Sequence, residues 1–404
     1  MRRLTLGLLM IFAFAVPWEY SLDIGEPFGN VARIAGLLLF AFTLVEFTFD
    51  QSMRRPGVLQ WLVLSFYLYF ACSYFWTREA DITLEKMRAY FQVMMIVWIV
   101  WEVGSSTMHL RGMLRAFVAG CWVLAVLTVF DFAMADAAAN QVRFVAAGQD
   151  PNDVARFLDI GFPIAALLFA TEEHWAIRLL ALAYLPAGLL AVLLTASRGG
   201  FSAALVALFG VTILLVLWKP QAASLTFLGL AITAAALLLF VPIGSLDRLA
   251  TLPQEAGAGD WNDRLNIWSA GWHAFQHAPW WGYGAGTFTS ASGLASGDTA
   301  HNTLLAVLVT GGLFGTTIYL SILIAVCWSI FKTSGILRVA LATAFISWGI
   351  SSMVGTVEEN RVTWLLFGMV SFAGRLASES PDSTMEEFSG KAVGETQLPA
   401  LAGG

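Results

Sequence analysis

Long apolar runs follow one another along almost the whole chain, separated by short polar segments. A helix that crosses a hydrocarbon core of about 30 Å needs about 20 apolar residues. Runs near this length occupy 4–18, 31–48, 58–76, 87–103, 111–134, 154–170, 176–194, 200–218, 222–243, 302–331, 338–356 and 361–376. Because the runs are continuous rather than alternating, they indicate helices and not strands. The pattern predicts an all-α, polytopic transmembrane helix bundle of about twelve spans.

The charges of the short connections predict an orientation. With the N-terminus inside, the inner connections hold Arg54, Arg55, Arg111, Arg115, Arg178, Lys219, Lys332 and Arg338. The outer connections hold Glu19, Asp23, Glu26, Asp150 and Asp153. Lys and Arg are enriched in cytoplasmic loops, so we expect both termini in the cytoplasm. The segment after Arg2 and Arg3 also resembles a cleaved signal peptide, but we interpret it as the first span.

One outer connection is much longer than the others and divides the chain. We predict an N-terminal transmembrane bundle (1–243), an outer loop domain (244–301), C-terminal transmembrane helices (302–377) and a disordered polar tail (378–404). Within the loop, apolar residues recur at helical spacing: Trp261, Leu265, Trp268, Trp272 and Phe275. They predict a helix that begins at a cap, Asp260 or Asn262, and ends before Pro279. This helix would lie in the membrane interface, on the ends of the spans, or both.

Composition narrows the class of protein. The chain of 404 residues is 58% hydrophobic and only 12% charged, with a net charge of -6. Charge is scarce along nearly the whole length, which excludes a soluble domain with one anchor. No basic block is present, so we expect no nucleic-acid partner. Cys72, Cys121 and Cys327 lie in apolar runs without a CxxC pair, and we predict buried free thiols.

Two outer arginines and a histidine are the strongest candidates for chemistry. Arg198 stands between two apolar runs, where an arginine costs a few kcal/mol unless it is solvated or paired. It either reaches lipid headgroups or supplies a fixed positive charge for an anionic ligand. Arg264 opens the loop helix, where backbone N–H groups also favour anions, or is a solvated surface residue. His301 lies where the loop re-enters the membrane, with Asn302 beside it to fix one tautomer, and could accept a proton near neutral pH.

Three other outer segments have weaker signals. Asp150–Asp153 reads as a turn into a span, with Asn152 or Asp153 as the helix cap. Glu358 and Arg361 lie in the last outer loop, where they could orient a basic residue, bind a sugar or form a solvated turn. The glycines at 282, 284 and 286 predict a compact turn that leads back to His301 rather than a nucleotide-binding loop, since no strand precedes them.

The order of these motifs resembles the O-antigen ligase and polymerase superfamily of bacterial envelope glycosyltransferases. The matching segments are Ser197–Gly200, Arg264 with Trp268, Trp272 through Pro279 to Gly284, His301–Asn302 and Gly311–Gly315, over about residues 190–320. The turn around Asn152 is also similar to a family feature, whereas the N-terminal half matches only in hydrophobicity. The resemblance implies a GT-C-like glycosyltransferase of the bacterial inner membrane, with its active site facing the periplasm.

The resemblance also implies substrates and roles. The donor would be an undecaprenyl-diphosphate-linked glycan, and the acceptor a lipid A-core or another glycan, with membrane lipids around the bundle and no metal or other cofactor. Arg198 and Arg264 match positions expected to contact the diphosphate, and His301 matches the essential histidine. Asn302, Arg361, Glu358 and Asn152 would have supporting roles.

Several functions are compatible with this apparatus. We favour a ligase that moves a finished O-antigen onto lipid A-core over a polymerase that adds repeat units and over a transferase that modifies Ser or Thr. A transporter of lipid-linked oligosaccharide belongs to another class. Transporters often have repeated halves and charges deep in their spans, whereas here the halves differ and the polar residues gather at one face. A scaffold would need no set of two arginines and a histidine.

Overall fold

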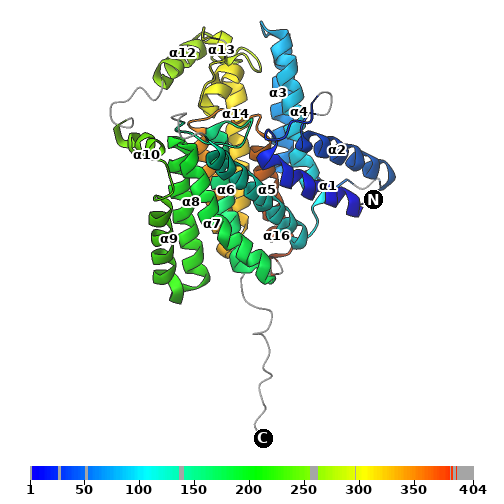
Figure 1. Ribbon diagram of the computed structural model, residues 1–404. Coiled ribbons are helices and arrows are strands. Elements are labelled where there is room, and N and C mark those ends of the chain that lie inside the picture. Colours follow the sequence, from blue (N-terminus) through cyan, green and yellow to red (C-terminus); the bar gives the residue numbers. More distant parts are fainter. Residues whose placement is uncertain are drawn as a thin grey trace.

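The chain folds into a bundle of helices, seen here in a computed structural model (Figure 1). The structure describes residues 2–25, 29–50, 53–135, 141–254, 263–295, 297–382, 384 and 388. The N-terminal elements are α1 (Arg2–Ala15), η1 (Val16–Trp18), α2 (Val31–Asp50), α3 (Val58–Cys72), η2 (Ser73–Phe75), α4 (Ala80–Val103) and α5 (Thr107–Met134). The central ones are α6 (Pro151–Thr171), α7 (Trp175–Thr195), α8 (Arg198–Trp218), η4 (Pro220–Ala222), α9 (Ala223–Leu237) and α10 (Ile243–Ala250). The last are α12 (Arg264–His277), α13 (Phe288–Ala291), α14 (Thr303–Lys332), α15 (Gly335–Ser352) and α16 (Arg361–Glu379).

The predicted all-α class is confirmed. Each of the twelve apolar runs coincides with a long helix, α1 to α9 and α14 to α16. Within the described residues, the strand-like structure is limited to an isolated bridge between Asp23 and Asn30. Eight of the described helices are long and apolar enough to cross a membrane: α2, α3 with η2, α5, α6, α7, α8, α14 and α15. The exact number of spans stays a prediction.

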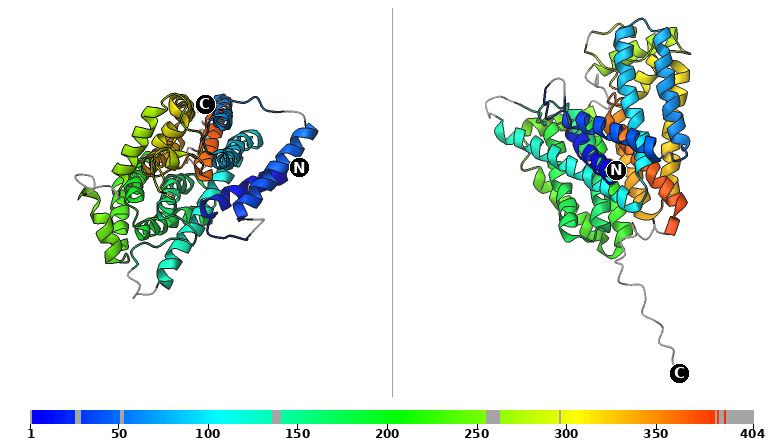
Figure 2. Two further views of the ribbon diagram at one scale, coloured as in Figure 1. Left: turned by 90° about the horizontal axis from the view of Figure 1, so that it is seen from above. Right: turned by 90° about the vertical axis from the view of Figure 1, so that its right-hand side faces the viewer.

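Helix α6 forms the centre of the bundle. Its span is 94% buried, whereas that of α2 is 17% buried. In Figure 1, α8 and α9 lie on one side of α5 and α6, and α1 and α2 on the other. Figure 2 shows α1 and α2 inclined to the upright helices α3, α4 and α14. The residues of α6 from Val154 to Leu168 are buried on every face of the helix, including the charged Arg156 and Asp159.

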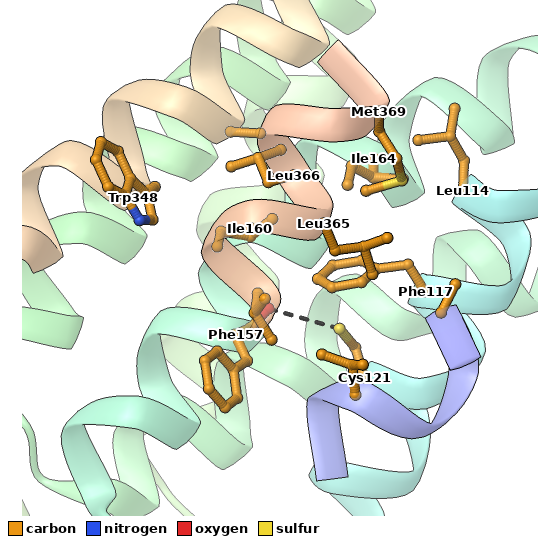
Figure 3. Packing of buried hydrophobic residues seen from close by; sticks show 14 of the residues in the cluster. Leu114, Phe117, Cys121, Phe157, Ile160, Ile164, Trp348, Leu365, Leu366 and Met369 are labelled. Carbon is orange, nitrogen blue, oxygen red and sulfur yellow. Dashed lines mark hydrogen bonds between the residues drawn. The ribbon is translucent and has the colours of Figure 1, made fainter. Parts of the chain in front are cut away.

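Side chains from α5, α6, α15 and α16 meet in the core beside α6 (Figure 3). The thiol of Cys121 is buried there and donates a hydrogen bond to the carbonyl oxygen of Phe157 at 3.5 Å. All three cysteines are free, as predicted. The prediction that all are buried is wrong, because Cys72 is exposed and Cys327 is half-buried. Cys72 is the last residue of α3, and Cys327 lies within α14.

In its described part, the loop domain carries three short helices, α10, α12 and α13, and the predicted boundary at 244 falls inside α10. In Figure 1, α12 and α13 lie together at the top of the bundle near α14. The structure divides the predicted apolar stripe of α12. Trp268 and Phe275 pack against the buried cluster of Ile267 and Ala274, whereas Leu265 and Trp272 are exposed. Gly271 is also buried, and a Cβ there would lie 3.0 Å from the ring of Phe288.

The start of α12 also differs from the prediction. The proposed caps, Asp260 and Asn262, and Trp261 of the stripe lie outside the described residues, as does Glu26 of the acidic outer group. The residue before α12 is Asp263, whose φ of 63° is left-handed and whose side chain makes no cap hydrogen bond.

At the other end, α16 continues to Glu379, one residue beyond the predicted start of the tail. The ring of Phe388 is buried and lies 5.4 Å from the Arg111 guanidinium carbon, so this part of the predicted disordered tail packs on the bundle. Residues 389–404 lie outside the described part.

The glycine-rich turn docks into a kink of α14. Gly312, within α14, has φ 59° and ψ −162°, so the helical hydrogen bonds across it are broken. The main chain of the turn replaces them. The N–H groups of Tyr283 and Gly284 donate to the carbonyls of Val309 and Thr310 at 3.1 and 2.9 Å. The N–H groups of Leu313 and Phe314 donate to the carbonyls of Pro279 and Trp280 at 2.8 and 3.2 Å. These four bonds satisfy two carbonyls and two N–H groups on either side of the kink, as apolar surroundings require.

Candidate functional site

A cavity of about 530 Å³ lies at the end of the bundle where α6, α8, α12 and α14 begin. Its lining residues are Arg143, Asn152, Ser197, Arg198, Gly199, Ser202, Arg248, Leu252, Arg264, Trp268, Asn302, Ile350, Met353 and Val354. We call it the arginine cavity, because its described lining includes four arginines and no acidic residue. Four of the residues singled out from the sequence line it: Arg198, Arg264, Asn152 and Asn302.

Arg198 is held by a sharp turn between α7 and α8. Ala196 has φ 47°, a conformation that L residues rarely adopt, and Ser197 then caps α8 by accepting from the N–H of Gly200 at 3.1 Å. Gly200 has no room for a side chain, because a Cβ there would run into Ala155 of α6. The guanidinium of Arg198 donates to the hydroxyl of Thr251 at 3.2 Å. The turn therefore packs the start of α8 closely against α6 and fixes the backbone position of Arg198 at the cavity.

Asn152 is a contact of the cavity wall rather than a helix cap. The cap of α6 is Asp150, which accepts from the N–H of Asn152 at 2.8 Å, so the prediction of Asn152 or Asp153 is wrong. The Asn152 side-chain oxygen instead accepts from the Ser197 hydroxyl at 2.7 Å and from the Arg143 guanidinium at 3.4 Å. Asn152 thus ties the turn before α8 to a third arginine.

Sequence reasoning missed Arg143 and Arg248. Both cover the C-terminal end of α7: Arg143 donates to the carbonyl of Thr195 at 3.1 Å, and Arg248 to the carbonyl of Ala196 at 3.2 Å. These carbonyls have no partner within the helix, so the arginines satisfy them. Burial lowers the pKa of Arg143, and the charge of Arg248 lowers it further. The available signal was that both are arginines in connections predicted to be outer, where the orientation rule predicts few positive charges.

Arg264 is the first residue of α12 and meets the same cavity from the loop. Burial lowers the pKa of its guanidinium, and the nearby positive charge of Arg198 adds to this effect. Like charges are costly together unless an anion joins them. The two arginines predicted to act together are therefore close enough to repel each other.

His301 directly precedes Asn302, which lines the cavity, and lies between two residues with fixed partners. The carbonyl of Ala300 accepts from the Trp268 indole N–H at 3.0 Å. Asn302 caps α14 by accepting from the N–H of Leu305 at 3.0 Å, and it donates to the carbonyl of Met353 at 3.3 Å. Asn302 thus holds the helix start rather than the imidazole, contrary to its predicted role. His301 has φ 44° and is itself absent from the cavity lining.

The electrostatics of His301 connect it with the arginine cavity. Burial lowers the pKa of its imidazole, and the positive charge of Arg264 lowers it further, while Asp150 and Asp298 act in the opposite direction. A lowered pKa keeps the imidazole neutral at pH 7, the state that can accept a proton.

The helix ends make the cavity more positive still. Asn152, Arg198, Arg264 and Asn302 each lie at the N-terminal end of a different helix, where free N–H groups and the helix dipole favour anions. The carbonyl groups at the nearby C-terminal ends of α7 and α15 accept hydrogen bonds from Arg143, Arg248 and Asn302. The arrangement can hold a ligand with about two negative charges, and in the described part of the chain no group of His, Cys, Asp or Glu is placed to bind a metal ion.

Glu358 and Arg361 belong to a different polar cluster. Arg361 forms an ion pair with the buried carboxylate of Glu19 and donates to the Gln92 side chain at 2.9 Å. Burial and the neighbouring Glu359 raise the pKa of Glu358 to about 7. Neither Glu358 nor Arg361 lines the arginine cavity, so the structure does not bring them together with the other predicted residues.

Comparison with known proteins supports the resemblance. The family model described as O-antigen ligase matches residues 182–320, which include α8, the loop domain, His301 and the kink of α14. A search of curated proteins finds no match. The matched segment contributes Arg198, Arg248, Arg264 and Asn302 to the cavity, whereas Arg143 and Asn152 come from outside it.

Proposed function

We propose that the chain, a member of the O-antigen ligase superfamily, transfers a glycan from undecaprenyl diphosphate to a lipid A-core acceptor on the periplasmic side of the inner membrane. The observation that carries the proposal is the arginine cavity, in which four arginines and four helix starts face one space. A diphosphate between a lipid and a sugar carries about two negative charges, and arginine binds such groups well. The cavity volume is within the range of small-ligand sites.

The arginines have a role in bond breaking as well as binding. When the anomeric C–O bond breaks, its electron pair goes to undecaprenyl diphosphate, which gains negative charge. Fixed positive groups that are already in place stabilise this charge without reorganising. Arg198 and Arg264 would contact the diphosphate, and Arg143 and Arg248 would add to the same field. This anionic leaving group requires neither ATP nor a metal ion.

His301 would be the general base. The acceptor hydroxyl oxygen forms the new bond to the anomeric carbon from the side opposite the diphosphate, so a single displacement inverts that centre. The proton of the hydroxyl passes to the neutral imidazole of His301. The lowered pKa of His301 supports this role because it keeps the base unprotonated near pH 7.

Reconstituted transfer tests the proposal. The purified full chain would receive a defined undecaprenyl-diphosphate-linked glycan, with lipid A-core as acceptor, in the presence of EDTA. We expect transfer by the wild type and a loss of at least about 100-fold in Arg198→Ala and in His301→Ala, because each removes a group that acts on the transition state. Arg78→Ala is the matched control, since Arg78 is exposed and lies outside the cavity. Full activity in the two cavity-side variants would refute the assignment.

The same assay separates the two members of the superfamily. A polymerase would lengthen a second lipid-linked glycan and leave lipid A-core unmodified. A ligase would do the reverse. Translocation into vesicles without any glycan transfer would instead indicate the transporter class.

A further inference from the structure

A second cavity of about 610 Å³ opens between α1, α2 and α4 and shares no lining residue with the arginine cavity. We call it the α2–α4 groove. Most of its lining is apolar and comes from these three helices, including Phe12, Leu39, Phe40, Met95 and Ile99. A groove of this kind in a membrane bundle can hold an acyl chain, because apolar surface in the bilayer is covered by lipid or by protein.

On both walls of the groove, an arginine is followed by an apolar stretch. On α2, Arg33 near the start is followed by Gly36, Leu39 and Phe40. On α4, Leu84 and Met87 line the groove before Arg88, and Met95 and Ile99 line it after Arg88. At 1.5 Å per residue, the stretch from Arg88 to Ile99 is about 16 Å long. Each helix therefore carries a positive charge with a hydrocarbon surface on its C-terminal side, which matches the headgroup and chain of an amphiphilic lipid.

The charge at the polar end is positive and uncompensated. The described lining contains three arginines, Arg33, Arg88 and Arg361, and no acidic residue. Arg361 is neutralised by its ion pair with Glu19. Arg33 and Arg88 are exposed, and within the described chain neither has an ion pair. Two positive charges thus remain, and both could pair with the phosphate of one lipid headgroup.

We propose that the α2–α4 groove binds one acidic phospholipid, with its phosphate between Arg33 and Arg88 and an acyl chain along Met95 and Ile99. The site is separate from the proposed donor cavity and does not depend on the transfer reaction. A free phosphate ion would not need the apolar wall, so the ligand is the lipid.

Native mass spectrometry of the full chain in detergent tests the site, with phosphatidylglycerol and phosphatidylcholine as probes. To remove binding at the arginine cavity, all variants would carry Arg198→Ala and Arg264→Ala. We expect one tightly retained phosphatidylglycerol and at least tenfold weaker retention of phosphatidylcholine. The further double change Arg33→Ala and Arg88→Ala should lower phosphatidylglycerol retention about tenfold, whereas Arg78→Ala should leave it unchanged.

Two further measurements separate charge from hydrocarbon. Leu37→Trp enlarges an exposed lining residue, so it should reduce retention of the lipid while both arginines remain. Millimolar inorganic phosphate should not displace the lipid. Equal retention of the two phospholipids, unchanged retention in the Arg33 and Arg88 variant, or displacement by phosphate would each overturn the proposal. Thermal unfolding without added lipid shows whether each variant is folded, and transfer assays on otherwise wild-type protein test the proposed function separately.

Discussion

At the scale of single residues, three side-chain-bearing residues in the described chain have positive φ: Ala196, Asp263 and His301. Each lies within two residues of a helix start at the arginine cavity. Such conformations cost about 1–3 kcal/mol and persist where the surrounding structure enforces them. The strain therefore lies at the positions where Arg198, Arg264 and the imidazole are aimed.

The pH dependence of transfer tests the role of His301. Burial and Arg264 lower its pKa from the ordinary 6.5, so the acidic limb of kcat/KM should lie below pH 6.5. Arg264→Gln removes a positive charge, raises the pKa of His301 and should move the limb to higher pH. Asp298→Asn removes a negative charge and should move it to lower pH. The test uses the pH of the acidic limb and not the absolute rate, because Arg264→Gln also weakens donor binding. If both variants shifted the limb in the same direction, the assignment of His301 as the base would be contradicted.

Arg143 tests whether the cavity acts as a whole. Arg143→Ala should raise the KM for the lipid-linked donor about 10- to 100-fold, since hydrogen bonds to a charged partner contribute about 1.5–3 kcal/mol. Arg143→Lys should recover only part of the loss, because an ammonium cannot form the paired hydrogen bonds of a guanidinium. Steady-state kinetics against donor concentration measures both. A KM equal to that of Arg78→Ala would exclude Arg143 from the donor site.

Much of the candidate site could be predicted because its motifs are local. Arg198 and Arg264 stand at helix starts that can be read from the apolar pattern, and both line the cavity. Arg143 and Arg248 could not be found in this way. Their roles come from contacts with the end of α7, about 50 residues away along the chain for each. Glu358 and Arg361 were predicted in an outer loop with the other candidates, but Arg361 pairs with the buried Glu19 in a different cluster, a contact that the sequence pattern does not encode.

At the scale of elements, the long helices follow directly from hydrophobicity, whereas their contacts do not. The apolar runs located α6 but could not show that it is the central helix. The stripe on α12 did not show which of its residues pack inward: Trp268 does, whereas Trp272 is exposed. The kink of α14 depends on hydrogen bonds to a turn some 30 residues earlier, which no local pattern encodes.

The kink provides a stability test. At Gly312, a Cβ would lie 2.5 Å from the carbonyl carbon and oxygen of Trp280, and φ is 59°. Gly312→Ala should therefore destabilise the protein by about 2–4 kcal/mol through backbone strain and overpacking. Gly349→Ala in α15 is the control, since nothing lies within 4 Å of its Cβ position. Thermal unfolding in detergent measures the difference. Equal unfolding temperatures would mean that the turn is not held as described.

At the scale of the whole molecule, the orientation can be tested by labelling. In a background with Cys72, Cys121 and Cys327 replaced by Ala, we would introduce Thr299→Cys or Lys332→Cys, both at exposed positions. A membrane-impermeant maleimide added to spheroplasts should label the cysteine at 299, near the arginine cavity. The cysteine at 332 should react only after the membrane is permeabilised. The reverse pattern would place the cavity in the cytoplasm.

The four helix starts around the arginine cavity have a consequence for regulation. Peptide groups do not titrate at physiological pH, and guanidinium groups stay protonated throughout this range. The affinity for a lipid diphosphate should then be nearly constant when the periplasm acidifies, whereas the protonated imidazole of His301 can no longer accept a proton. At acidic pH such an enzyme would keep its donor bound but would not catalyse transfer. Transfer would resume when the pH returns to neutral.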